Sequence, residues 1–279
     1  MIGNGSIDVG ADPVRISALG AFEQWDGRLG PGNLNAFFAM NRTIELARKN
    51  GLAGVGLRNT HHWMRGGTYG WQAADAGMIG ICWTNSMQNM PPWGSDEPRL
   101  GNGPLVIAIP RSEGHVVLDM STTQFSFGTL SNRRMHGESL PVPGGFDAKG
   151  RLTTDPGAIE ESMRPLPIGY WKGSGLSLVL DMAAAILSGG RASHQISRDP
   201  LHEIGLSQVF LAFDPQRLDN PFNADELATA LIQHLHDSRT DSGGKPVRYP
   251  GERTLAVRRE NEINGIPVDE SIWAEILAM

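Results

Sequence analysis

Cysteine is nearly absent from this 279-residue sequence, which contains a single one, Cys82. One cysteine excludes an internal disulfide and a cluster of thiolate metal ligands. Cys82 lies in an apolar run, so we expect a buried, unreactive thiol. The adjacent pair His61 and His62 has no cysteine or carboxylate ligand close by in the sequence, and we therefore expect no metal site.

Positive charge and long apolar runs are also scarce. The formal net charge is −6, which argues against nucleic acid as a partner, although one or two arginines in a cleft can still bind a small anion. The longest apolar stretch, residues 176–187, is shorter than a membrane span and contains Asp181. The first residues show no basic segment followed by an apolar one. These features predict a cytoplasmic protein without a membrane partner.

The glycine signatures of common nucleotide sites are missing as well. No Gly-x-Gly-x-x-Gly follows a predicted strand, and Gly54-Val55-Gly56 lies inside one. A Rossmann-type site is therefore unsupported, and the phosphates of any cofactor would need other donors. The segment 171–175, WKGSG, offers Lys172 and several backbone N–H groups at the start of a predicted helix, where an anion is favoured. A flexible turn with a solvated lysine explains the segment equally well.

Strands and helices interleave along the chain, which predicts an α/β fold. Apolar runs bounded by polar turns predict strands at 52–57, 79–84, 105–109, 116–119 and 206–213. Helical periodicity and end signals predict helices at 33–50, 69–76, 175–187, 224–235, 254–264 and 270–277. The stretch 130–172 is rich in glycine, proline and charge, and we expect it to be largely irregular.

Three groups of side chains are candidates for chemistry. His62 follows a predicted strand, and histidine is the side chain that ordinarily exchanges a proton near neutral pH; it could equally be a surface histidine. Asp119 ends another strand, where it could bind a ribose or an amide, or cap a turn. Four tryptophans between residues 63 and 93 could stack on a sugar or heterocycle, or fill the core.

Several longer segments together resemble the malate/L-lactate dehydrogenase-type oxidoreductases, an NAD(P)-dependent family without a Rossmann fold. The matching segments keep their order over nearly the whole chain: ISALGAFEQWD (16–26), HWMRGG (62–67), IGICWTNS (79–86), MPPWG (90–94), DMS (119–121), GYWKGSG (169–175) and RYPGE (248–252). The resemblance implies a non-Rossmann mixed sheet flanked by helices, with C-terminal helices. It also implies a homodimer.

The resemblance further implies a cofactor site and a proton donor. NAD, used as NADH, is the expected cofactor, with NADP as the alternative. His62 is the acid–base candidate in the substrate cleft. The residues expected to bind the cofactor are His115, Val116, Val117, Leu118, Asp119, Met120, Ser121, Trp171, Lys172, Gly251, Glu252 and Arg253.

Members of the family carry a helical arm ahead of the point at which this sequence starts. That arm contains a Ser-His-Gly motif, whose histidine is the usual proton donor, followed by an arginine that helps to hold the substrate carboxylate. In this chain, the donor is expected to be His62 or a histidine supplied by such an arm. We divide the chain into a residual N-terminal arm (1–13), a cofactor-binding α/β domain (14–215) and a C-terminal helical region (216–279).

The sequence thus predicts an enzyme that transfers hydride between NAD(P)H and a keto group of a linear, anionic sugar acid. Three alternatives stay open. The protein could be a weakly active or inactive dinucleotide-binding relative, or it could act on malate, lactate or ureidoglycolate as other members of the family do. It could also be a sugar-binding module that uses its tryptophans without a cofactor.

Overall fold

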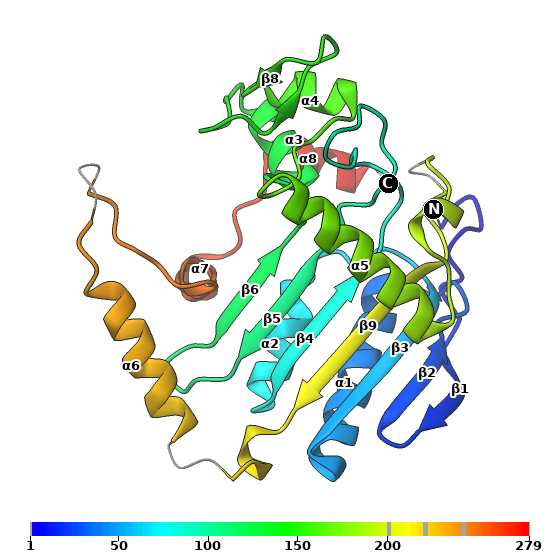
Figure 1. Cartoon of the computed structure of the whole chain (residues 1–279), viewed down its shortest axis with the longest axis vertical. Helices are drawn as coiled ribbons and strands as arrows, with labels where there is room; N and C mark the ends of the chain where they lie inside the picture. Colours follow the sequence, from blue (N-terminus) through cyan, green and yellow to red (C-terminus); the bar gives the residue numbers. More distant parts are fainter. Residues whose placement is uncertain (1, 200–201, 220–222, 241–243, 279) are drawn as a thin grey trace.

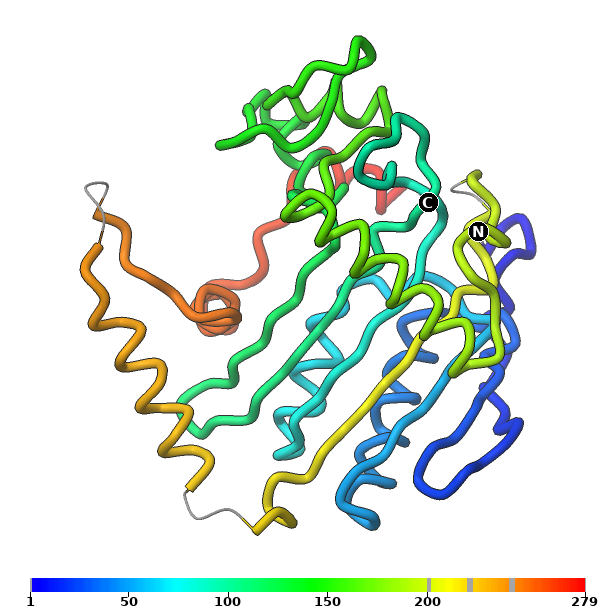
Figure 2. The backbone as a smooth tube through the Cα atoms, viewed as in Figure 1, coloured from blue at the N-terminus to red at the C-terminus, as the bar shows by residue number. Residues whose placement is uncertain are grey.

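A computed structural model describes residues 2–199, 202–219, 223–240 and 244–278. Its centre is a seven-stranded sheet in the spatial order β1-β2-β3-β9-β4-β5-β6 (Figures 1 and 2). The strands are β1 (Val14–Leu19), β2 (Phe22–Asp26), β3 (Leu52–Thr60), β4 (Ile79–Thr84), β5 (Leu105–Ile109), β6 (Val116–Met120) and β9 (Leu206–Phe213). Strands β2 and β3 pair in parallel and the other neighbours pair antiparallel, so the predicted mixed sheet is confirmed.

The sheet has a helical layer on each face (Figure 1). Helices α1 (Gly32–Asn50) and α2 (Gly67–Asp75) cover one face, where the main hydrophobic core forms around buried residues such as Met40, Val55 and Phe210. Helix α5 (Trp171–Ser188) crosses the other face and packs mainly on β9 and β3. Burial on both faces explains why the central strands are continuous apolar runs.

A small lobe follows β6. It contains α3 (Phe127–Met135), a hairpin of β7 (Gly145–Phe146) and β8 (Leu152–Thr153), and α4 (Pro156–Ser162), around a core of Leu130, Leu140 and Ile159. The prediction of an irregular stretch at 130–172 is therefore wrong over α3 and α4. Both helices have side-chain caps, Ser126 and Asp155, which satisfy N–H groups in their first turns.

The described residues of the C-terminal region form three helices, as predicted. They are α6 (Ala224–His236), α7 (Glu252–Asn264) and α8 (Glu270–Leu277). A short 3₁₀ segment, η3 (Pro215–Arg217), precedes them, and another, η1 (Ser193–Gln195), lies between α5 and β9. Helix α6 extends outward beyond the β5–β6 edge of the sheet, and α7 lies beside β6 (Figures 1 and 2). None of the described residues of these three helices is buried.

Two expectations about helix starts need correction. Helix α5 begins at Trp171 rather than at residue 175, so Trp171 and Lys172 lie inside its first turn. Helix α1 begins at Gly32 rather than at residue 33, and its N-cap is Pro31 without a side-chain hydrogen bond. Within the described residues, no helix is both long and apolar enough to cross a membrane.

Candidate active site

A cavity of about 410 Å³ opens beside the edge strand β6. One wall is made by Val117 to Asp119 of β6, and the opposite wall by residues 248–251 and Thr254 at the start of α7. Arg65, Gly67 and Trp71 complete the lining. Cofactor and small-molecule sites usually occupy about 300–1,000 Å³, so this cavity has room for part of a dinucleotide.

The free edge of β6 presents backbone polar groups to this cavity. The N–H of Val117 points away from β5 and donates to the carbonyl of Pro250 at 2.9 Å. Because backbone groups alternate along a strand, the N–H and carbonyl of Asp119 face the same way. An amide or hydroxyl of a bound ligand can therefore hydrogen-bond to the strand edge at Asp119.

Gly251 lets the start of α7 approach β6 closely. Its φ is +95°, and a Cβ at this position would lie 3.0 Å from the amide nitrogen of Val117. Any other residue would be strained and crowded against the strand. Gly251 is the N-cap of α7 and provides no side-chain cap. The N–H of the acidic Glu252 already donates to the carbonyl of Tyr249, and the N–H groups of Arg253 and Thr254 can serve an anion. The cleft thus suits a ligand that carries phosphates.

The carboxylate of Asp119 is already partly engaged. Its Oδ2 accepts a hydrogen bond from the N–H of Gly67, the first residue of α2, at 2.9 Å, and lies 3.9 Å from Nε of Arg65. Asp119, on β6, therefore caps α2, whose own N-cap is a glycine without a side chain to do so. The Oδ1 atom has no such bond to Gly67, which leaves it as a further acceptor for a ligand.

His115 uses both of its ring nitrogens within the protein. Its Nδ1 accepts from the backbone N–H of Arg111 at 3.0 Å, so Nε2 carries the proton and donates to Asp75 at 3.0 Å. Trp71 packs against the same ring, with centroids 5.5 Å apart. The predicted role of His115 in cofactor binding would therefore fall to its backbone rather than to its imidazole.

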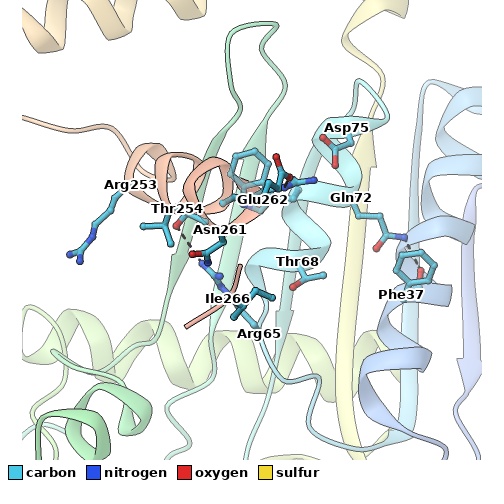
Figure 3. Close-up of a pocket in the computed structure, with 13 residues that line it drawn as sticks. Phe37, Arg65, Thr68, Gln72, Asp75, Arg253, Thr254, Asn261, Glu262 and Ile266 are labelled. Carbon is cyan, nitrogen blue, oxygen red and sulfur yellow. Dashed lines mark hydrogen bonds and ion pairs between the residues drawn. The ribbon is translucent and has the colours of Figure 1, made fainter. Parts of the chain in front are cut away.

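A larger cavity of about 1000 Å³ adjoins the first and shares three lining residues with it. It lies between α1 and α2 on one side and α7 on the other (Figure 3). Arg65 bridges the two sides, because its guanidinium donates to Oγ1 of Thr254 at 3.4 Å. Arg253 also lines this cavity, although in Figure 3 its guanidinium points away from the other labelled side chains.

The start of α5 lies beside the C-terminal end of β6. A Cβ on Gly173 would lie 2.6 Å from the carbonyl oxygen of Thr122, which brings the first turn of α5 against the residues after β6. Trp171 and Lys172 are exposed, and among the described residues neither lines either of these two cavities. The structure thus brings β6 and Gly251 together in one cavity and places Lys172 at its flank, so the cofactor roles stay predictions.

His62 is exposed in the loop between β3 and α2. Its Nδ1 accepts from the N–H of Met64 at 3.1 Å, which leaves the ring proton on Nε2. His62 lines neither cavity, whereas Arg65 and Gly67 of the same loop do line the smaller one. Met64 in this loop and Asn59, near the end of β3, both have positive φ, a strained conformation that often marks functional segments.

The neighbouring His61 has a different environment. It is buried, its Nε2 lies 2.8 Å from the carbonyl oxygen of Ser6, and its Nδ1 has no partner. Burial lowers the pKa of His61, which keeps the ring neutral. The two adjacent histidines thus point to different surroundings, as expected for consecutive residues. Among the described residues, no group of three or more metal-ligating side chains gathers at this or any other place.

The other sequence expectations have mixed outcomes. Cys82 is buried as predicted, and burial raises the pKa of its thiol. Trp63 and Trp83 belong to the core, Trp71 is partly buried, and Trp93 is half exposed. Arg65 and Thr254 line the cleft and were missed. Arg65 carried a signal, because it lies within a segment that matches the family, but nothing in the sequence indicated that Thr254 packs against it.

The mixed, non-Rossmann sheet has a ligand cleft along its edge strand, β6. The sequence pattern of the malate/L-lactate dehydrogenase family matches residues 1–277, and the chain belongs to this family. It is therefore an oxidoreductase, and a dehydrogenase of this kind implies a nicotinamide cofactor.

Particular relatives are similar over most of their length. The 2,3-diketo-L-gulonate reductase of Escherichia coli O6:K15:H31 is 48% identical over 276 residues, which are 99% of this chain and 83% of that protein. A dehydrogenase structure from Sinorhizobium meliloti is 28% identical with a TM-score of 0.87, and it covers 99% of this chain and 81% of its own. The malate dehydrogenase of Pyrococcus horikoshii OT3 is 26% identical with a TM-score of 0.87, over 98% and 77% of the two chains.

Proposed function

We propose that this protein reduces a keto group of a linear sugar acid of the 2,3-diketo-L-gulonate type, with NADH as the hydride donor. The structural observation that carries the proposal is the cleft in which the free edge of β6 faces the glycine turn at the start of α7. The 48% identity to 2,3-diketo-L-gulonate reductases over 99% of the chain supports the choice of substrate class.

The residues of the cleft fit a nicotinamide dinucleotide. The strand edge at Asp119 offers an amide donor and acceptors, and the first turn of α7 offers N–H groups together with Arg248 and Arg253 nearby. Lys172, in the first turn of α5, adds a positive charge at the flank of the same region. The reduced nicotinamide supplies the hydride when it is bound. The protein supplies orientation and charge compensation.

His62 is the proposed proton donor to the reduced oxygen. As placed, its Nδ1 is an acceptor for Met64 N–H and its Nε2–H is exposed, so Nε2 is the atom that can reach a substrate oxygen. A fully protonated ring would carry a proton on Nδ1 and would lose the Met64 hydrogen bond. Proton donation by His62 therefore couples to a movement of the strained loop at Met64.

The assay is direct. The protein is mixed with NADH and 2,3-diketo-L-gulonate, and the loss of absorbance of the reduced nicotinamide is followed. In parallel assays NADPH replaces NADH, and oxaloacetate or pyruvate replaces the sugar acid. NADH oxidation with the sugar acid and weaker use of oxaloacetate or pyruvate is the expected pattern. Faster use of oxaloacetate would favour the malate alternative, and NADH binding without any turnover would favour an inactive relative.

Two variants separate the roles of the site. His62→Ala should lower kcat by about 10²–10⁴-fold, the usual contribution of a positioned general acid. Lys172→Ala should raise the KM for NADH more than it lowers kcat, because a flanking charge acts on binding. Unchanged turnover in His62→Ala would remove His62 from the mechanism. A purely kcat-linked loss in Lys172→Ala would remove Lys172 from the cofactor site.

We also propose a homodimer that works in the cytoplasm. An apolar stripe of Leu178, Val179, Met182 and Ile186 is exposed on the outer side of α5, which is unusual for a helix facing water. A second copy of the chain would bury this stripe. Sedimentation analysis should show a dimer, and a monomer at micromolar concentration would contradict it.

A reducing compartment would keep the lone thiol of Cys82 reduced.

A further inference from the structure

A separate cavity of about 590 Å³ lies outside the proposed cofactor cleft. One wall is the loop 91–96, which contains Trp93, and the other is formed by Phe146, Arg164 and Pro167 at the base of the small lobe. Two aromatic rings and one guanidinium therefore face the same space. This combination differs from the apolar interior of the protein and from its ordinary charged surface.

Arg164 has no anionic partner among the described residues. Its guanidinium lies over the ring of Phe146, 5.3 Å from the centroid, and its Nε is buried without a hydrogen-bond acceptor. Among the described residues, no carboxylate lies within 4.0 Å of it, and Asp96, which lines the same cavity, is exposed to solvent. A buried donor of a charged group without an acceptor costs free energy, so an anion in this cavity would bind favourably.

The backbone around Arg164 is fixed. Its carbonyl accepts from the N–H of Phe146 at 2.9 Å, and its N–H donates to Oγ of Ser162 at 3.2 Å. A Cβ on Gly145 would lie 2.6 Å from the same carbonyl oxygen, so only glycine permits this close approach. The side chain of Arg164 is therefore projected from a rigid base, which favours specific recognition over loose charge attraction.

The loop with Trp93 is fastened to the start of α5. The N–H of Trp93 donates to Oγ of Ser174 at 2.7 Å, and its ring lies 4.8 Å from that of Tyr170. Tyr170 has φ of 61° and ψ of −112°, a strained conformation for a residue with a side chain. One wall of the cavity is thus attached to the segment that carries Trp171 and Lys172, which we propose for cofactor binding.

From these contacts we infer that the Trp93–Arg164 cavity is a subsite for a carboxylate carried on a short polyhydroxylated chain. Arg164 would bind the carboxylate with its forked N–H groups, and Trp93 would pack against the C–H face of the chain. The inference rests on the proposed function in one respect: it assigns this acid to the substrate of the neighbouring site. The binding of the carboxylate by Arg164 does not depend on the proposed reaction.

The kinetic test uses Arg164→Met, which keeps the length of the side chain and its contact with Phe146. The KM for the keto sugar acid should rise about tenfold to a hundredfold, the equivalent of losing hydrogen bonds to a charged group, while the KM for NADH stays unchanged. Arg151→Met is the matched control, because Arg151 lies in the same lobe but is exposed and paired with Asp147 at 2.8 Å. An unchanged KM in Arg164→Met overturns the inference.

A binding test separates this inference from the proposed function. Calorimetric titration with L-gulonate and with D-glucitol, its uncharged alditol, requires no turnover. The wild type should prefer the acid, and Arg164→Met should lose this preference, whereas Arg164→Lys should keep part of it. The wild type could reduce no keto acid while Arg164→Met still loses the preference for L-gulonate over D-glucitol. That result would contradict the proposed function and support the subsite. Thermal unfolding checks that the wild type and Arg164→Met are both folded. If they are, equal binding of L-gulonate by the two overturns the subsite.

Discussion

The sheet with its covering helices and the C-terminal helices are stabilised in different ways. Helix α1 buries nine residues against the sheet, while α6, α7 and α8 bury none of their described residues. The C-terminal region is attached to the sheet region through hydrogen bonds. Among them, Ser112 donates to Asp225 of α6 at 2.7 and 2.8 Å, Arg111 donates to the Tyr249 hydroxyl at 3.2 Å, and the N–H of Val117 on β6 donates to the carbonyl of Pro250. The proposed cofactor cleft therefore has one wall with its own core and one wall without.

Hydrogen exchange gives the largest expected difference between the two regions. Amides of β3 and β9 should exchange at least about 10³-fold more slowly than those of α6, α7 and α8, because regions with few buried contacts open at low free energy. NADH should slow exchange at the start of α7, around Gly251, and leave α6 unchanged. Mass spectrometry of exchanged peptides measures both effects. Equal protection of the two regions would show that the C-terminal helices are stabilised by burial after all.

Glu23 tests the stability of the sheet region. This buried carboxylate is bound by Arg42 at 2.8 and 2.9 Å, and the hydrogen bonds from Arg42, with those from Trp25 and Arg15, lower its pKa to about 2. Glu23→Gln should reduce the free energy of unfolding by about 2–3 kcal/mol at neutral pH. Denaturant titration measures the loss. The affinity for NADH should not change, because Glu23 lies far along the sheet, on β2.

The same carboxylate predicts an acid dependence. The folded pKa of Glu23, about 2, lies below its ordinary value of 4.5, so its stabilisation is present above pH 4.5 and is lost as the pH falls towards 2. Glu23→Gln should lack this component. Glu138→Gln is the control, since Glu138 pairs with Arg133 at the surface and its replacement should cost about 0.5 kcal/mol or less. Equal costs for both variants would contradict the assignment.

Gly251 tests the contact between the two regions. Gly251→Ala should weaken NADH binding about tenfold, because the new Cβ meets the Val117 amide and must move the start of α7 off β6. Gly265→Ala is a matched control at the other end of α7, with a similar φ of +85° but nothing within 4 Å of its Cβ. Fluorescence titration of NADH compares the variants. Equal affinities would mean that the close approach at Gly251 does not shape the cofactor site.

His61 gives the smallest expected effect. Burial holds its folded pKa below the ordinary 6.5, so the unfolded chain binds the proton more readily as the pH drops below 6.5. The free energy of unfolding of the wild type should therefore fall as the pH drops through this window. His61→Gln should remove this part of the pH dependence. His234→Gln, at an exposed site on α6, should leave it intact; a curve unchanged by His61→Gln would contradict the prediction.

Sequence patterns predicted the fold best where an apolar pattern ends at a clear turn. The bounds of β4, β5, β9 and α8 agree with the prediction because their ends coincide with polar or glycine-containing turns. Strands β1 and β2 were missed because charged and polar residues interrupt them, Glu23 among them, and its partner Arg42 comes from α1. Helix α3 was missed because it is short and buries only Leu130.

The candidate site was predictable only in parts. The sequence indicated that Asp119 ends a strand, but its hydrogen bond to Gly67 joins residues 52 positions apart and depends on the strand order. The approach of Gly251 to Val117 likewise follows from the path of the chain after β9, which no local pattern encodes. Lys172 was expected just before a helix that starts at residue 175. The helix starts at Trp171 instead, so Lys172 lies in its first turn.

The position of β9 has a consequence for how the chain is made. This strand lies in the middle of the sheet, between β3 and β4, although it is the last strand in the sequence. A growing polypeptide therefore cannot join the β1–β3 half to the β4–β6 half until residue 213 has left the ribosome. Such late, long-range pairing raises the contact order and slows folding. Unjoined strand edges on nascent chains would then be the substrates on which chaperones act.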